Sequence, residues 1–359
     1  MRFKKPALAI LAVAVLGVSG CSTMAYYWQS VSGHLELMNA ARPLPEWLQD
    51  SQTPEKLRTR LELAQRIRRF AVSELHLPDN ASYQRYADLQ RKAVVWNVTA
   101  APALSLKPET WCFPVAGCVG YRGYFDEQEA RAEAARLQAT GLDVHVYGVP
   151  AYSTLGWMNW AGGDPLLSTF VGYPEGDLAR LIFHELAHQV VYAQDDTPFN
   201  ESFATAVERL GVARWLVASG SDKARTDYAA LEQQRLQFRA LTRDTRRALT
   251  AIYESKSPSA HNRQAQLAMK TIAMDNFRTS YAELKKTWTP PAGTIEAYDR
   301  WVAQANNASF GAQAAYDDLV PGFEALFARS GGNWPAFYDE VRQLASLSKD
   351  ERLKKLAVR

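Results

Sequence analysis

Five residues in the middle of the chain, His184-Glu185-Leu186-Ala187-His188, have the types and spacing of a metal-dependent hydrolase site. On a helix, positions i and i+4 lie on the same face, so both imidazoles can bind one metal ion. Glu185 follows the first histidine and can take a proton from a water held by that ion. The motif therefore predicts a Zn²⁺ site with Glu185 as its general base.

The residues around this motif predict two antiparallel helices. Pro174-Glu175-Gly176-Asp177 is typical of a turn that ends in an N-cap, and the apolar spacing from Leu178 to Leu186 indicates a helix with one buried face. We expect Asp195-Asp196-Thr197-Pro198 to end this helix, because proline cannot continue it. A second helix then begins at Asn200, and the short connection brings it back beside the first.

The third metal ligand is expected from this second helix. Glu201 lies in its first turn and can reach both histidines, which leaves one position open for water. Glu208 lies seven residues further on the same face; it is the alternative ligand, or it orients one of the histidines. The competing interpretation is a buried helix pair whose histidines bind carboxylates without a metal.

His184-Glu185-x-x-His188 followed by Asn200-Glu201-x-Phe203-Ala204 resembles the gluzincin peptidases, whose second motif is N-E-x-F-A. The gap between the two motifs is shorter here than in the gluzincin aminopeptidases, and their glycine-methionine-glutamate-asparagine strand is missing. The chain is more similar to a family of bacterial lipoproteins labelled predicted aminopeptidases. The segments that carry this resemblance cover most of the chain: the lipobox ending at Cys21, 95–98, 117–125 and 150–156.

The resemblance implies a zincin-like zinc peptidase, with a peptide as the substrate. It places a small sheet ahead of the metal-binding helix, with an edge strand that binds the substrate backbone. It also implies that the segment 152–157 lines the cleft and that Tyr152 stabilises the oxyanion, with Tyr173 and Tyr192 as alternatives. Tyr152 as an ordinary aromatic of the cleft wall remains open.

The start of the chain has the pattern of a lipoprotein signal peptide. Basic residues precede an apolar run over 7–18, which is too short to span a membrane and ends in Val18-Ser19-Gly20-Cys21. We expect cleavage before Cys21 and lipid on its sulfur, which anchors the chain to a membrane. Ser22 at the next position implies the outer membrane, facing the periplasm. The alternative is an ordinary secreted protein with a cysteine at this position.

Net charge and cysteine content bear on the expected partners of the chain and on the pairing of its cysteines. The formal net charge of +3 equals the contribution of the leader residues Arg2, Lys4 and Lys5, so the remaining chain is balanced and nucleic acid is not an expected partner. In an oxidising compartment Cys112 and Cys118 are expected to form a disulfide that closes a short loop. A second metal site at these cysteines is the alternative.

The expected fold class is α+β and mostly helical. After the leader (1–20), one zinc peptidase-like domain covers 21–359: a helical part to 90, a part with the sheet and the metal-binding helices over 91–220, and a helical part from 221. Strands are expected over 92–101, 119–125 and 142–147, with a helix from Asp126 between the last two. We interpret Asp164 as a turn residue and 352–359 as a fraying end.

The sequence thus predicts a membrane-anchored zinc peptidase, most simply an aminopeptidase. A zinc endopeptidase is the alternative within the same class, because no residue is an evident carboxylate for the free amine of a substrate. A lipoprotein that binds peptides or cell-wall components without catalysis is the alternative from another class. The intact Glu185 argues against it, since a binding site has no need of a base beside the metal.

Overall fold

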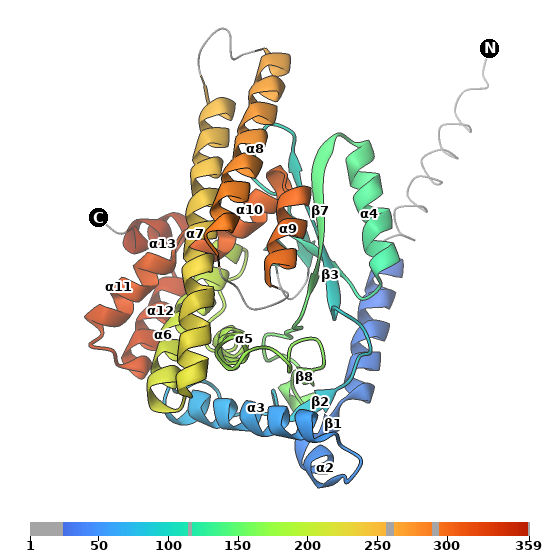
Figure 1. The fold of residues 1–359 in the computed structure, drawn as a ribbon, viewed down its shortest axis with the longest axis vertical. Coiled ribbons are helices and arrows are strands. Elements are labelled where there is room, and N and C mark those ends of the chain that lie inside the picture. Colours follow the sequence, from blue (N-terminus) through green and yellow to red (C-terminus); the bar gives the residue numbers. More distant parts are fainter. Residues whose placement is uncertain (1–23, 114–116, 256–261, 289–293, 358–359) are drawn as a thin grey trace, which may run out of the picture.

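A computed structural model describes residues 24–113, 117–255, 262–288 and 294–357. In Figure 1 these residues form a largely helical molecule with small sheets, which confirms the predicted α+β, mostly helical class. The predicted leader, the lipid site Cys21 and Ser22 lie outside the described residues. None of the helices described is long and apolar enough to cross a membrane.

The amino-terminal part is helical, as predicted. A helix over 24–40 is followed by α2 (Leu44–Gln49) and by α3 (Glu55–Ser73). Pro54 precedes α3, where its missing N–H costs nothing. The inner face of α3 packs against the metal-motif helix and belongs to the largest core cluster of the molecule.

The main sheet has the strand order β6–β3–β7, with β3 (Val95–Pro102) antiparallel to both neighbours, β6 (Arg122–Tyr124) and β7 (Leu142–Val149). Helices α4 (Glu127–Ala139) and α10 (Asn307–Asp317) pack against this sheet and lie on either side of it in Figure 1. Alternation along β3 therefore directs Val98 and Ala100 into the core cluster with α4. Asn97 and Thr99 lie on the other face, toward the cavities described below.

The strand expected over 119–125 is wrong as a single element. Residues 117–119 form β5 (Gly117–Val119), which pairs with β4 (Trp111–Phe113), whereas β6 pairs with β3. The chain changes sheets at Gly120 and Tyr121, because the Cys112–Cys118 disulfide ties β5 to β4. A further small sheet joins β1 (Arg42–Pro43), β2 (Arg85–Ala87) and β8 (Leu166–Leu167).

The two motif helices are α5 (Glu175–Ala187) and α6 (Thr197–Ala218), and their boundaries differ from those expected. Pro174, not Asp177, precedes the first helical residue of α5, which ends with His188 as its C-cap. Pro198 lies in the first turn of α6, where a proline has no hydrogen bond to lose. The segment 195–198 therefore begins the second helix instead of ending the first.

The described residues from 222 onward are mostly helical, as predicted. Its elements are α7 (Asp222–Tyr253), α8 (Arg263–Lys286), α9 (Thr294–Gln304), α11 (Val320–Arg329), α12 (Trp334–Ala345) and α13 (Lys349–Leu356). The expected fraying end is wrong for 352–356, because Arg352 and Leu356 are buried on α13. Arg352 pairs with Asp196, the N-cap of α6, at 3.0 Å between Nε and Oδ2.

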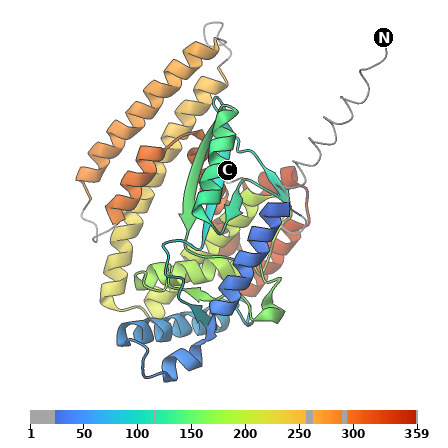
Figure 2. The ribbon, with the colours of Figure 1, turned by 90° about the vertical axis from the view of Figure 1, so that its right-hand side faces the viewer.

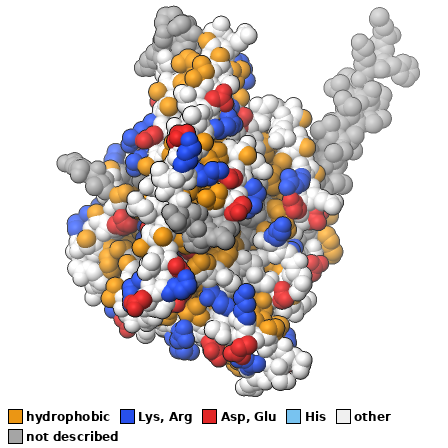
Figure 3. Space-filling model, viewed as in Figure 1, with side chains coloured by type: hydrophobic (Ala, Val, Ile, Leu, Met, Phe, Trp, Pro, Cys, Tyr) orange, Lys and Arg blue, Asp and Glu red, His pale blue; other side chains and the backbone are white. Residues whose placement is uncertain are grey.

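On the face of the molecule seen in Figure 3, Lys and Arg side chains are interspersed with Asp and Glu. Among the ion pairs of the molecule, several join residues one turn apart on the same helix, such as Lys223 with Asp227 on α7. Such exposed pairs are each worth a few tenths of a kcal/mol (about 0.3–0.5).

Candidate metal centre

Three side-chain atoms from α5 and α6 converge on one point. His184 Nε2 lies 3.2 Å from His188 Nε2 and 3.3 Å from Glu201 Oε2, and the third side of the triangle, from His188 Nε2 to Glu201 Oε2, measures 3.6 Å. Donors about 2.0 Å from a tetrahedral Zn²⁺ are separated by about 3.3 Å. The size of the triangle and its two nitrogens and one carboxylate oxygen therefore fit a tetrahedral metal ion.

The antiparallel helix pair creates this triangle. His188, at the end of α5, faces Glu201 near the start of α6, whereas Arg180, two turns earlier on α5, faces Glu208. The connecting loop is fixed by Asn200, whose side chain accepts from Ala193 N at 2.7 Å and donates to Ala193 O at 2.8 Å. The first turn of α6 is thereby held opposite the last turn of α5.

Glu208 does not belong to the triangle but binds one of its members. Its Oε2 lies 3.1 Å from His184 Nδ1, and its Oε1 accepts from Arg180 Nε at 3.1 Å. Burial opposes the ionisation of Glu208, but Arg180 and His184 outweigh it and lower its pKa to about 2. An ionised Glu208 requires His184 Nδ1 to donate, so the other ring nitrogen, Nε2, is the atom that a metal ion at the triangle would bind in place of a proton.

Charge is balanced within the site. Burial alone would lower the pKa of His184, but Glu201 and Glu208 outweigh it and raise this pKa well above its usual value. Burial likewise opposes the charge on Glu201, yet the two histidines hold its pKa well below its usual range. Glu201 is therefore ionised, which is the form that binds a cation.

Replacement of Glu208 by glutamine should weaken metal binding about 10- to 100-fold, because partners of this kind fix the ring and tautomer of a ligand histidine. Competition with a chelator of known affinity measures the change. Glu74→Gln, which removes a carboxylate paired with Arg214 on the exposed surface, is the matched control and should leave the affinity unchanged. An equal affinity of Glu208→Gln and the control would contradict this role.

Glu185 lines the cleft beside the triangle without belonging to it. Burial raises its pKa, although the two histidines and a hydrogen bond with Ser153 act in the opposite direction. Ser153 also lies 3.5 Å from Asp164, measured between Oγ and Oδ2. Glu185 is therefore joined through Ser153 to a second buried carboxylate.

Asp164 is this second carboxylate, and its interpretation as a plain turn residue is incomplete. It follows Gly162 and Gly163, both with positive φ, but its side chain is buried. Its carboxylate accepts from Thr154 Oγ1 at 2.8 Å and from Thr154 N at 3.0 Å, and burial raises its pKa to about 6. Asp164 thus holds the cleft-lining segment 150–155 in place next to Glu185.

The cleft itself has a volume of about 430 Å³ and is bounded by the metal helices, the sheet, helix 24–40 and the segment 149–155. Tyr152, Ser153 and Leu155 line it, as expected for this segment, whereas Trp157 is 65% exposed. Tyr152 packs against His34 and Phe125, with ring centroids at 5.7 and 5.3 Å.

Three further tyrosines line the cleft in the neighbourhood of Glu201. Tyr121, Tyr192 and Tyr316 line it, and the charge of Glu201 contributes to the raised pKa of each after burial, the main cause. The rings of Tyr316 and His184 are stacked, with their centroids 6.3 Å apart. Sequence reasoning missed Tyr121 and Tyr316, whereas Tyr173, one of its alternatives, does not line the cleft.

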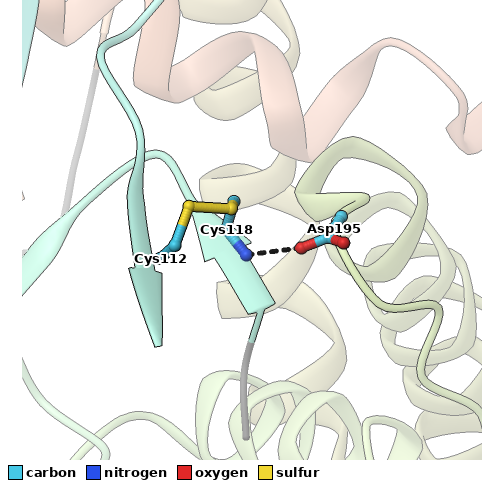
Figure 4. Close-up of a disulfide and its surroundings, with 3 residues drawn as sticks. All are labelled: Cys112, Cys118 and Asp195. Atoms are coloured by element: carbon cyan, nitrogen blue, oxygen red, sulfur yellow. Dashed lines mark hydrogen bonds between the residues drawn. A yellow bond between two sulfur atoms is a disulfide. The ribbon is translucent and has the colours of Figure 1, made fainter. Parts of the chain in front are cut away.

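The predicted disulfide between Cys112 and Cys118 is present and joins β4 to β5. Cys118 N donates to Asp195 Oδ1 at 2.6 Å, so the hairpin is attached to the loop between α5 and α6 (Figure 4). A side chain at Gly117, whose φ is +70°, would overlap this carboxylate. Closure of so short a loop contributes about 2 kcal/mol to stability. The neighbouring Phe113 and Val119 form part of the cleft wall.

The paired helices thus bring two histidines and a carboxylate together in a group that could hold a metal ion, with Glu185 in the same cleft. The family model described as "Putative aminopeptidase" matches residues 25–356, nearly the whole chain. The chain belongs to this putative aminopeptidase family, which supports a peptidase activity and confirms the resemblance to predicted aminopeptidases. No curated protein and no solved structure matches the chain significantly.

Proposed function

We propose that the chain is a zinc-dependent peptidase, most simply an aminopeptidase. The observation that carries the proposal is the donor triangle of His184, His188 and Glu201 with Glu185 beside it in one cleft. A bound Zn²⁺ supplies a Lewis acid and an acidified water to this cleft. Two imidazole nitrogens and one glutamate oxygen are a set of protein donors found at catalytic zinc sites of peptidases.

The described residues account for the proton transfers. Glu185 accepts the proton of the attacking water and delivers it to the amine that leaves. Its partner Ser153 holds the carboxylate in the cleft, and burial raises the pKa of Glu185. Glu208 keeps His184 in the tautomer that binds a metal.

The second candidate is a zinc endopeptidase, and one observation favours it. Among the described residues that line the cleft, the carboxylates are Glu185 and Glu201. Both have roles in the proposed chemistry, so neither is free to hold the amino group of a substrate. An aminopeptidase needs such a group, or a cleft closed at one end.

The zinc-loaded protein should hydrolyse short peptides with a free amino terminus and leave the same peptides intact after N-acetylation. Chromatography of the products with matched peptide pairs measures the difference. Equal cleavage of blocked and free peptides would establish the endopeptidase alternative. If the metal-loaded protein cleaves neither set of peptides, the proposal of catalysis is wrong, and the alternative of a peptide-binding protein takes its place.

Tyr152 remains the proposed oxyanion donor. Its replacement by phenylalanine should lower kcat about 10²-fold without a change in bound metal, because one hydrogen-bond donor to the oxyanion is lost. Tyr173→Phe is the matched control, since Tyr173 lies outside the cleft lining. Full activity of Tyr152→Phe combined with loss in Tyr316→Phe would transfer the role to Tyr316, whose ring is stacked on His184.

We also propose that lipid on Cys21 anchors the chain to the outer membrane with the catalytic domain in the periplasm. The support is the leader pattern that ends at Cys21, the disulfide, which forms in oxidising compartments, and Ser22 after the lipid site.

A further inference from the structure

The helix over 24–40 exposes a continuous apolar stripe on its outer face. The side chains of this stripe are between 41% and 75% exposed: Met24, Tyr27, Trp28, Val31 and Leu35. Their spacing of three and four residues places them within about 100° of one face of the helix. An exposed apolar surface of this kind marks a site that binds a membrane or another molecule.

The opposite face of the same helix is fixed to the domain, so the stripe cannot turn inward. Gly33 lies so close to Phe125 that an added Cβ would be 2.2 Å from its ring. The Gln29 side chain accepts from Phe125 N at 3.0 Å, and Leu37 is buried in the main core. Figure 2 shows this helix (dark blue) across the front of the molecule, with its outer side uncovered by other described elements.

The chemistry of the stripe fits the interface of a bilayer. Tyrosine and tryptophan have apolar rings with one polar atom, and they concentrate where acyl chains meet headgroups. Glu36 is the one ionised side chain within 24–40, and the segment contains no lysine or arginine. Binding is therefore driven by burial of apolar surface and does not require anionic lipid.

The position of the stripe in the chain identifies its partner. Two residues separate Cys21 from Met24, so the Cα atoms of Cys21 and Met24 are at most about 11 Å apart even in extended chain. A lipid chain on Cys21 holds the amino end of the helix at the membrane surface, next to its own apolar face. Nothing comparable in the described residues would hold a second copy of the chain against this face.

We propose that the outer face of helix 24–40 lies in the headgroup region of the bilayer that holds Cys21. This inference builds on the proposed lipid anchor. The helix would lie along the membrane, with Met24, Trp28 and Val31 toward the acyl chains. Its inner face supplies Tyr26 and Ser30 to the cleft wall, so the catalytic cleft is held close to the membrane surface.

The first experiment uses the full lipoprotein in vesicles of phosphatidylethanolamine and phosphatidylglycerol with brominated acyl chains. The chain has 10 tryptophans, so Trp28 is isolated as the difference between wild type and Trp28→Phe. We expect bromolipid to quench this difference emission. Protein that stays on the vesicles with unquenched Trp28 emission would overturn the inference and leave the anchor intact.

The second experiment is independent of the lipid. A Cys21→Ser chain expressed without residues 1–20 should still bind the vesicles weakly. Val31→Asp in this background should reduce binding about tenfold, because a charge replaces two methyl groups that the membrane would bury. Val217→Asp is the matched control, since Val217 is 83% exposed on α6. Thermal unfolding verifies that both variants are folded. Equal binding of the two variants would refute the inference.

The remaining outcomes separate the anchor from the stripe. If the wild-type chain lacks the mass of a lipid on Cys21 and leaves the vesicles, the anchor proposal is wrong, and the Cys21→Ser arm still decides the stripe. If sedimentation shows a dimer that Val31→Asp dissociates, while vesicle binding is absent, the stripe is an interface between copies and the inference is wrong.

Discussion

A Glu185→Gln variant should lose peptidase turnover by about 10³-fold and keep its metal. The amide has the size of the carboxylate and can still bond to Ser153, but it cannot accept the proton of the attacking water or pass it to the leaving amine. Metal binding is retained because Glu185 contributes no atom to the donor triangle. Steady-state kinetics on a free-amine peptide, together with elemental analysis of the same sample, measures both quantities.

Glu175→Gln is the matched control for this variant. Glu175 lies in the first turn of the same helix, away from the cleft lining, and its carboxylate accepts from Trp215 Nε1 at 3.1 Å. An amide oxygen can replace that acceptor, so activity should remain. If Glu185→Gln kept wild-type turnover with bound metal, Glu185 would not be the general base, and a catalytic role for the motif would need another proton acceptor.

The grouping of His184, His188 and Glu201 could be predicted because its geometry is local. Four residues along a helix fix the histidine pair, and a short loop fixes Glu201 opposite it. The three side chains come together as expected, even though the assignment of 195–198 as a helix end was wrong. Beginning α6 at Thr197 keeps Glu201 within the early turns of the helix, so the side chain still faces the end of α5.

The rest of the site could not be predicted, because it comes from distant parts of the chain. Tyr316 reaches the cleft from α10, and Tyr121 reaches it from the point where the chain changes sheets. Nothing in the local sequence around either residue indicates these neighbours. The position of Arg180 beside His184 could be predicted, since it precedes His184 by four residues on one helical face. Its pairing with Glu208 depends on how the two helices pack and could not be predicted.

Burial explains the other differences between the predicted and the observed surroundings of residues. Asp164 has the sequence context of a turn, and its conformation is a turn, but the surrounding fold closes over its carboxylate and makes it an anchor for Thr154. Arg352 has the context of a charged chain end. It is buried because Asp196, the cap of α6, offers a carboxylate and Phe199 a ring face at 5.3 Å. In both residues a charge is tolerated because a partner is present, and sequence patterns do not show partners.

Zinc content of the mature chain should be about one ion per molecule, and His188→Ala should lose it. His188 supplies one corner of the donor triangle, and the two remaining donors, His184 and Glu201, are too few for a stable tetrahedral site. Elemental analysis after dialysis against zinc-free buffer measures the content. His145→Ala is the matched control. His145 is 6% exposed and His188 is 7% exposed, but His145 lies on β7 outside the donor group.

The same measurement separates the ligand from the residue that orients it. Glu201→Gln should reduce zinc affinity by more than the roughly 10- to 100-fold expected for Glu208→Gln, since a donor atom of the triangle is lost in the first variant and a hydrogen bond to a ligand in the second. The reverse order would make Glu208 the ligand and require His184 to bind through Nδ1. If wild-type protein takes up no metal from added zinc, the carboxylates serve only to bind the histidines of a packed helix pair, and the peptidase proposal fails at its first step.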